Sequence, residues 1–226
     1  MRIAVIGAGA VGLYFGAKLQ RAGHDVRFLL RRDYDAITAS GLTVTSPAGD
    51  FHLDRVQGFR SSREMGEVDL VLVALKAFAN KHLVEMVRPL MQGDTAVLTI
   101  QNGLGNEELL AEAFGAERVL GGVALVGCNR GEPGVVHHLA YGAIRLGEFS
   151  GRPSPRAKQF AAAFNDAGIN CEEVSRKFRL LETVGEHVWM RRRDINPRLQ
   201  DLTGLGLRSR FRWKFKLTLW RRSCRF

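Results

Sequence analysis

The sequence predicts an α/β protein in which helices cover both faces of a mostly parallel sheet, followed by a tail that is poorly ordered or partly helical. Apolar runs of strand length alternate with segments of helical periodicity, which is typical of βαβ units. A glycine-rich turn joins the first of these runs to the first helical segment. Beyond Val174 the alternation ends. We therefore expect two parts, a folded domain at residues 1–174 and an atypical segment at residues 175–226.

The first strand, Ile3 to Gly7, leads into a Gly-x-Gly-x-x-Gly turn and then into the helix Val11 to Ala22. In this context the first glycine permits a tight turn, the second lets backbone approach a pyrophosphate, and the third lets helix and strand pack closely. The helix N-terminus offers unpaired N–H groups and a partial positive charge to the anion. Residues Gly7 to Gly12 therefore predict a Rossmann-like, dinucleotide-binding domain.

The choice of dinucleotide is decided at the end of the second strand, Val26 to Leu30. An acidic residue about 20 positions past the glycines accepts hydrogen bonds from the ribose of NAD, whereas an arginine there suits the 2′-phosphate of NADP. Arg31 and Arg32 follow this strand, and a guanidinium binds phosphate in a bidentate manner. NADP(H) is therefore favoured, with Arg31 as its contact. Asp33 is close enough to this position that NAD remains possible as the cofactor. The structural alternative is that Arg31 and Arg32 are simply solvated and bind no phosphate.

Two further strand pairs are expected. Leu42 to Val44 and Phe51 to Leu53 flank a Ser-Pro-Ala-Gly turn signal and predict a hairpin. Gly134 to Leu139 and Ala143 to Leu146 are expected to turn through Tyr141-Gly142 and to extend the sheet antiparallel. The remaining strands expected are Leu70 to Ala74, Ala96 to Gln101 and Val119 to Val126. The remaining helices expected are Tyr34 to Ser40, Asn80 to Arg88, Glu107 to Phe114 and Pro155 to Ala167.

Composition excludes several classes of protein. No apolar run approaches the roughly 20 residues of a membrane span, so no membrane partner is expected. Cys128, Cys171 and Cys224 are widely spaced and match no metal or disulfide pattern, which favours a reducing cytoplasm. His137 and His138 are adjacent on an expected strand, point to opposite faces and cannot share one metal. We expect no metal site and interpret the two histidines as structural.

Charge divides the chain at the same place as the fold pattern. Residues 1–174 carry a net charge of −1, whereas residues 175–226 carry +11 and all three tryptophans. This last segment alternates basic and apolar residues without a sustained helical stripe and has little with which to build a core. Its composition would allow it to bind nucleic acid or an acidic membrane surface. No known nucleic-acid module is present, so nucleic acid is not the expected partner.

Three further motifs carry a family resemblance. Leu75 to Phe78 form a Leu-Lys-Ala-Phe motif, and Gln101 to Gly105 form a Gln-Asn-Gly-Leu-Gly motif. The third motif begins at Gly121 to Ala124 and continues to Gly134 to His138. Together with the glycine turn and Arg31, these motifs resemble the ketopantoate reductases, or 2-dehydropantoate 2-reductases, over residues 1–174. The resemblance implies an NADPH-dependent reduction of the 2-oxo acid ketopantoate to pantoate, on the route to pantothenate and coenzyme A.

The resemblance also implies roles for particular residues. Lys76 and Asn102 follow the C-terminal ends of expected strands, where open α/β sheets bind ligands. In the family the corresponding Lys lies by cofactor and substrate, and the Asn contacts both the nicotinamide ribose and the substrate, so that it can orient the two reactants. A solvated lysine and a turn-forming asparagine are the structural alternatives. Cys128 falls in a stretch that, in the family, lays backbone against the cofactor. The expected cofactor-binding residues are thus Gly7, Ala8, Gly9, Ala10, Val11, Gly12, Arg31, Lys76, Asn102 and Cys128, with Lys76 and Asn102 also contacting substrate.

The sequence departs from the family beyond Val174. The family's general acid is a Lys in a Trp-x-Lys motif that opens a helical substrate domain, and this motif is absent here. Lys177 lacks the preceding Trp, so no catalytic residue is assigned and the activity of this chain is in question. A shift of reading frame near Leu180 would explain the change of composition. One alternative is a reductase of another 2-oxo acid or of an imine. The other is a non-catalytic dinucleotide-binding protein with a nucleic-acid-binding tail. The sequence also leaves a homodimer open.

Overall fold

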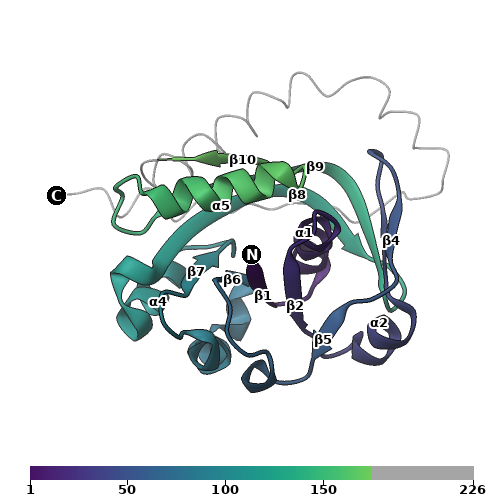
Figure 1. Ribbon diagram of the computed structural model, residues 1–226, viewed down its shortest axis with the longest axis horizontal. Helices are drawn as coiled ribbons and strands as arrows, with labels where there is room; N and C mark the ends of the chain where they lie inside the picture. Colours follow the sequence, from purple (N-terminus) through teal and green to yellow (C-terminus); the bar gives the residue numbers. More distant parts are fainter. Residues whose placement is uncertain (175–226) are drawn as a thin grey trace, which may run out of the picture. The chain divides into compact units, whose positions relative to one another are not determined.

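The first strand of the fold is β1 (Arg2–Ile6), which pairs in parallel with β2 (Asp25–Leu29) on one side and with β6 (Leu70–Val73) on the other. The computed structural model describes residues 1–174; the expected tail and its boundary at residue 175 lie outside the described residues. Figure 1 shows β1 and β2 beside α1 (Ala10–Arg21), the helix that follows the glycine turn. The expected parallel core is therefore confirmed.

The parallel sheet continues on both sides of these strands. Strand β7 (Ala96–Thr99) pairs with β6, and β8 (Val119–Arg130) pairs with β7. At the other edge lies β5 (Gln57–Phe59), parallel to β2. Sequence patterning did not predict β5, because three residues that include a glycine carry no recognisable alternation. The order across the described sheet is β4 (Phe51–Leu53), β3 (Leu42–Thr45), β9 (Val135–Glu148), β8, β7, β6, β1, β2 and β5, with β10 (Asn170–Glu173) attached to β9.

The prediction of a turn at Tyr141-Gly142 is wrong. A single strand, β9 (Val135–Glu148), runs through both residues and pairs antiparallel with β8. Tyr141 has φ 64° and Gly142 has φ 113°, and the pairing register shifts close by, between Leu125 and Val126. The positive φ angles that a Tyr-Gly pair suggests therefore belong to a β-bulge, which bends a strand without ending it.

Short strands complete the sheet. The expected hairpin is confirmed, since β3 (Leu42–Thr45) and β4 (Phe51–Leu53) pair antiparallel, and β3 also pairs in parallel with β9. The last described strand, β10 (Asn170–Glu173), pairs in parallel with β9 and was not predicted. Its sequence, Asn-Cys-Glu-Glu, is too short and polar to indicate a strand.

Most of the expected helices are present within residues 1–174. They are α1, α2 (Tyr34–Ser40), α4 (Asn106–Phe114) and α5 (Pro155–Asp166). The helix expected at Asn80 to Arg88 is instead divided into η2 (Ala77–His82), α3 (Leu83–Val87) and η3 (Arg88–Leu90). Pro89 prevents a continuous helix at one end, and side-chain bonds of Asn80, described below, hold the other. Two short 3₁₀ turns, η1 (Ser62–Glu64) and η4 (Ala116–Arg118), lie in connections.

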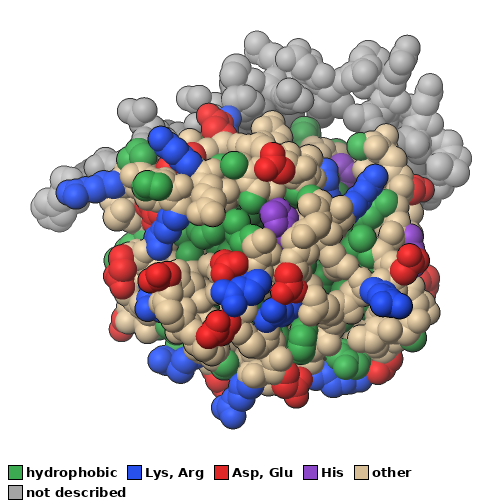
Figure 2. Space-filling view, in the orientation of Figure 1, with side chains coloured by type: hydrophobic (Ala, Val, Ile, Leu, Met, Phe, Trp, Pro, Cys, Tyr) green, Lys and Arg blue, Asp and Glu red, His purple; other side chains and the backbone are tan. Residues whose placement is uncertain are grey.

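Helices pack on both faces of the sheet, as the sequence predicts. One face packs against α1, α2 and α5 through a core that includes Phe15, Phe28 and Phe164. The other face packs against α3 and α4 through a smaller core that includes Ile6 and Leu110. Acidic and basic side chains are interspersed on the face shown in Figure 2, in keeping with the small net charge of residues 1–174. Within those residues, no helix combines the length and the apolar character needed to span a membrane.

Candidate functional site

The turn between β1 and α1 can be formed only with glycine at two of its positions. Gly7 has φ +103°, and a Cβ there would lie 2.5 Å from the backbone nitrogen of Leu75. A Cβ at Gly12 would lie 2.3 Å from the carbonyl oxygen of Gly7. The turn closes with a 2.7 Å hydrogen bond from Gly9 N–H to that same oxygen. These contacts account for the first and third glycines of the motif by close packing.

Gly9 answers a different requirement. A Cβ built there meets nothing nearer than the Gly7 oxygen at 4.0 Å, so the protein itself leaves this position open. Gly9 is also the N-cap residue of α1, and no side chain caps that end of the helix. Open space beside uncapped N–H groups at a helix N-terminus suits a pyrophosphate. The residues present therefore fit a dinucleotide.

The candidate residues follow four neighbouring strands of the sheet. The glycine turn follows β1, Arg31 follows β2, Lys76 follows β6 and Asn102 follows β7, and these strands are adjacent in the order β7-β6-β1-β2. Parallel strands bring all four segments to the same, carboxyl-terminal edge. The side chains of Arg31, Lys76 and Asn102 are exposed and have no hydrogen-bond or ion-pair partner among residues 1–174. They are available to a ligand.

A chain of side-chain amides joins the Lys76 loop to the Asn102 loop. Gln101 Nε2 donates to Asn80 Oδ1 at 2.8 Å, and Asn80 Nδ2 donates to Asn106 Oδ1 at 2.7 Å. Asn106 Nδ2 in turn contacts the carbonyl oxygens of Asn102 and Gly103 at 3.5 and 3.4 Å. Sequence reasoning missed this chain, although Gln101 and Asn106, both buried polar residues, flank the Asn-Gly-Leu-Gly motif. The chain sets the spacing of the two loops.

Two large apolar side chains project from the same two loops. Phe78 is 82% exposed and Leu104 is 72% exposed, the highest values among the large hydrophobic residues of the described part. Phe78 lies two positions after Lys76, and Leu104 lies two positions after Asn102. The edge that carries the candidate residues therefore also presents apolar surface.

Asp33 is not available to a ligand. Its carboxylate is buried and forms an ion pair with the guanidinium of Arg130, at the end of β8. Arg31, two residues earlier, faces solvent. The two residue types that distinguish NAD from NADP at the end of the second strand thus occupy opposite environments.

Cys128 lies in β8 and is half-buried. Burial raises the pKa of its thiol to about 12, so that the thiol stays protonated and weakly nucleophilic at neutral pH. The hydroxyl of Tyr14, on α1, likewise has its pKa raised to about 12, mainly by burial. Cys128 is therefore suited to contacts through its backbone and apolar surface rather than to thiol chemistry.

The adjacent histidines of β9 have separate structural partners, in agreement with their interpretation from the sequence. His137 Nδ1 is 2.7 Å from Thr45 Oγ1. His138 Nδ1 is 2.8 Å from Ser46 Oγ, and its ring stacks on that of Tyr14 with centroids 4.4 Å apart. No group of three His, Cys, Asp or Glu residues within the described chain is placed to hold a metal ion.

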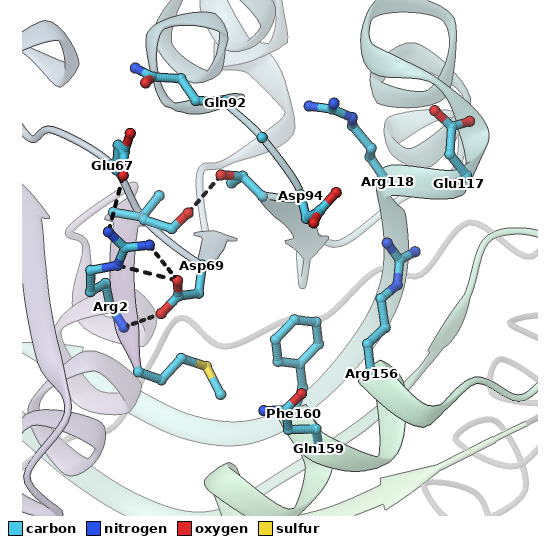
Figure 3. A pocket seen from close by; sticks show the side chains of 14 residues that line it. Arg2, Glu67, Asp69, Gln92, Asp94, Glu117, Arg118, Arg156, Gln159 and Phe160 are labelled. Carbon is cyan, nitrogen blue, oxygen red and sulfur yellow. Dashed lines mark hydrogen bonds and ion pairs between the residues drawn. The ribbon is translucent and has the colours of Figure 1, made fainter.

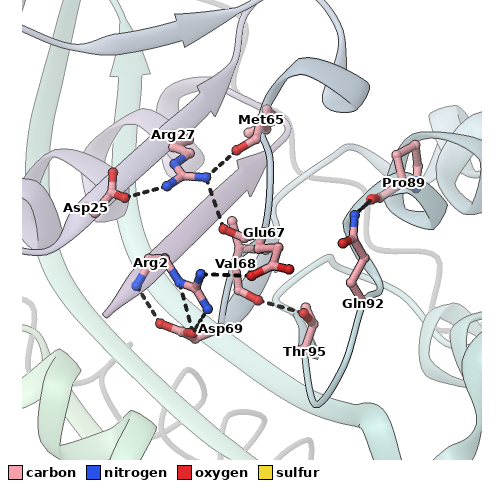
Figure 4. A network of polar contacts seen from close by, with 10 residues as sticks. All are labelled: Arg2, Asp25, Arg27, Met65, Glu67, Val68, Asp69, Pro89, Gln92 and Thr95. Atoms are coloured by element: carbon pink, nitrogen blue, oxygen red, sulfur yellow. Dashed lines mark hydrogen bonds and ion pairs between the residues drawn. The ribbon is translucent and has the colours of Figure 1, made fainter.

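An open groove of about 920 Å³ lies at the opposite, amino-terminal edge of the strands (Figure 3). Its walls include Arg2, Asp69 and Thr95, which precede or begin β1, β6 and β7. Figure 4 shows that the Arg2 guanidinium donates hydrogen bonds to the carboxylates of Asp69 and Glu67, with Arg2 Nη2 2.7 Å from Asp69 Oδ1. Thr95 Oγ1 donates to the carbonyl oxygen of Val68 at 2.6 Å. These groups are engaged with one another, and the groove lies apart from the candidate site.

The chain is also similar to known proteins. Residues 3–151 match the family model described as ketopantoate reductase PanE/ApbA. The chain is 41% identical over 176 residues to a 2-dehydropantoate 2-reductase of Nostoc sp., covering 76% of this chain and 55% of that protein. It is 31% identical to the 2-dehydropantoate 2-reductase of Mesorhizobium japonicum, covering 92% of this chain and 68% of that protein.

A solved structure is also similar. The crystal structure of 2-dehydropantoate 2-reductase from Geobacter metallireducens is 57% identical, with a TM-score of 0.76, and the match covers 77% of this chain and 58% of that one. The chain thus spans little more than half the length of the Nostoc and Geobacter relatives. The family model covers more than half of the present sequence. The chain therefore belongs to the ketopantoate reductase PanE/ApbA family.

Proposed function

We propose that residues 1–174 form the NADP(H)-binding part of an enzyme that reduces a 2-oxo acid, with ketopantoate as substrate and pantoate as product. The observation that carries the proposal is the turn from Gly7 to Gly12, which is open at Gly9 and leads into the uncapped N-terminus of α1. Backbone N–H groups there bind the pyrophosphate of the cofactor. Arg31 binds the 2′-phosphate, because a guanidinium pairs with phosphate through two parallel hydrogen bonds.

The reacting end of the site is assigned to Lys76 and Asn102. The bound dinucleotide supplies the hydride. Lys76 places a positive charge next to the 2-oxo acid, whose carboxylate it attracts, and the Asn102 amide holds the nicotinamide ribose and the substrate in one orientation. Phe78 and Leu104 present apolar surface beside this edge. Ala8, Ala10, Val11 and the backbone near Cys128 complete the cofactor contacts.

The general acid is not assigned within residues 1–174. Proton transfer to the developing alkoxide contributes a factor of about 10²–10⁴ in rate. We therefore test the function of this chain by its binding of the dinucleotide and not by its turnover of substrate. The free thiols of Cys128 and Cys171 suit a cytoplasmic location.

Titration of the full chain with NADPH, followed by nicotinamide fluorescence and by calorimetry, tests this proposal. Saturable binding is expected, together with weaker binding after Arg31→Ala. Arg63→Ala is the matched control, because Arg63 lies in η1 and its side chain has no partner among residues 1–174. A folded chain that gives no heat and no fluorescence change with NADPH would overturn the proposal. Ketopantoate and other 2-oxo acids, added to the NADPH complex, then identify the substrate class.

A further inference from the structure

Asp33 occupies the N-cap position of α2 but does not cap the helix. Asp is among the residues preferred at that position, where its carboxylate normally accepts a hydrogen bond from the first turn. Here no side-chain cap bond is formed. The carboxylate instead pairs with Arg130 Nη2, from a residue 97 positions later in the chain. Helix capping therefore does not explain this aspartate.

The sheet fixes Arg130 in place for this ion pair. Arg130 is the last residue of β8 and lies opposite Val136 of β9. The tip of the β8–β9 connection is anchored to β3 by a 2.9 Å bond from Thr43 N–H to the Gly134 carbonyl oxygen. A Cβ at Gly134 would lie 3.2 Å from the carbonyl oxygen of Gly41, the C-cap residue directly after α2. The connection thus packs closely against the end of α2, whose beginning carries Asp33.

The paired carboxylate lies where a dinucleotide would be selected. Asp33 is about twenty residues past the glycine turn, at the position from which an acidic residue accepts hydrogen bonds from the ribose of NAD. A free carboxylate there would also repel a 2′-phosphate. The side chain of Asp33 is only 3% exposed, whereas that of Arg130 is 32% exposed. Pairing therefore withdraws the negative charge from solvent and from any ribose.

We propose that the Arg130–Asp33 ion pair sets the preference of this site for a 2′-phosphorylated dinucleotide. Arg130 acts through Asp33 as a positioning residue: it holds the carboxylate away from the ribose and neutralises it, while Arg31 and its neighbour Arg32 remain exposed positive charges. The inference rests on the proposed function, because it assumes that this edge of the sheet binds a dinucleotide.

The test measures dissociation constants of the full chain for NADPH and for NADH, with thermal unfolding recorded for every variant. Arg130→Gln releases Asp33, and the ratio of NADPH affinity to NADH affinity should fall about tenfold, equivalent to about 1.4 kcal/mol. Asp33→Asn should keep or raise the ratio. The double variant should recover the ratio of the unaltered chain, because the released carboxylate is then absent. Arg130→Lys, which retains the charge, should keep the preference even if Arg130→Gln fails to fold.

Three results would overturn the inference. The first is an unchanged ratio in a folded Arg130→Gln variant. The second is a double variant with the same loss as Arg130→Gln, which would show that Arg130 contacts the phosphate directly. The third is a lowered ratio after Asp33→Asn. If the unaltered, folded chain bound neither dinucleotide, the proposed function itself would fall and this inference with it, a result distinct from binding without a change of preference.

Discussion

Gln101 Nε2 donates a 2.8 Å hydrogen bond to Asn80 Oδ1, and this bond crosses between the loops that carry Asn102 and Lys76. The Asn80 amide is used at both ends, because its Nδ2 donates to Asn106 Oδ1 at 2.7 Å. Gln101 and Asn106 are buried, so bulk water cannot reach them to replace the hydrogen bonds that Asn80 makes, and losing those bonds costs unfolding free energy. This one side chain therefore links the two candidate ligand-binding loops, which follow the paired strands β6 and β7.

Asn80→Ala should therefore destabilise the fold and weaken ligand binding together. Loss of the amide leaves a buried donor and a buried acceptor without partners, which costs about 1–3 kcal/mol of unfolding free energy. Urea unfolding and NADPH titration measure the two effects. Asn170→Ala is the matched control, because Asn170 is exposed and its side chain has no partner among residues 1–174. Equal stability of the two variants would contradict the role given to Asn80.

The three glycines of the turn should respond differently to alanine. Gly12→Ala brings a Cβ to 2.3 Å from the Gly7 oxygen, and such overpacking costs about 1–3 kcal/mol. Gly9→Ala brings a Cβ no nearer than 4.0 Å to any protein atom and should leave unfolding unchanged while weakening NADPH binding. Chemical denaturation with parallel titration separates the two. A Gly9→Ala variant that binds NADPH normally would show that the pyrophosphate does not lie over this turn.

The sequence predicted the elements whose side chains alternate between the two cores. It also predicted the glycine turn, because the Gly-x-Gly-x-x-Gly spacing between a strand and a helix is visible in the sequence itself. It did not predict β5 and β10, since these short polar strands form only through pairing with β2 and β9. The turn predicted at Tyr141-Gly142 was wrong because residues with positive φ occur in β-bulges as well as in turns. The sequence could not predict the Arg130–Asp33 ion pair, because only tertiary folding brings together residues 97 positions apart.

Lys76→Ala should affect ligand binding and not stability. Its side chain is exposed and makes no hydrogen bond or ion pair within the described residues, so the change in unfolding free energy should stay within about 0.5 kcal/mol. Loss of a charged hydrogen-bond donor to the substrate carboxylate costs about 1.5–3 kcal/mol, or roughly 10–150-fold in affinity. Titration of the NADPH complex with ketopantoate measures this loss. Lys158→Ala, at an exposed position of α5, is the control; an equal loss of affinity there would remove the case for Lys76.

Acid should weaken the link between the amino-terminal ends of β1 and β6. The hydrogen bonds from Arg2 hold the pKa of Asp69 below its usual value of 3.8, so the folded chain binds this proton more weakly than the unfolded chain. The stabilisation is therefore complete above the unfolded pKa and is lost as the pH falls through the lower, folded value. Because both side chains are more than one third exposed, solvent screens the pair and the stabilisation at pH 7 is small.

Asp69→Asn should remove this pH-dependent contribution. The variant should be less stable than the unaltered chain at pH 7, and the difference should shrink towards zero as the pH falls well below 3.8, where the Asp69 carboxyl is protonated. Urea unfolding at several pH values measures the difference. Asp94→Asn is the control, since Asp94 is exposed and forms no ion pair among residues 1–174. A constant difference between Asp69→Asn and the unaltered chain across the whole range would mean that the contribution of Asp69 does not depend on its charge.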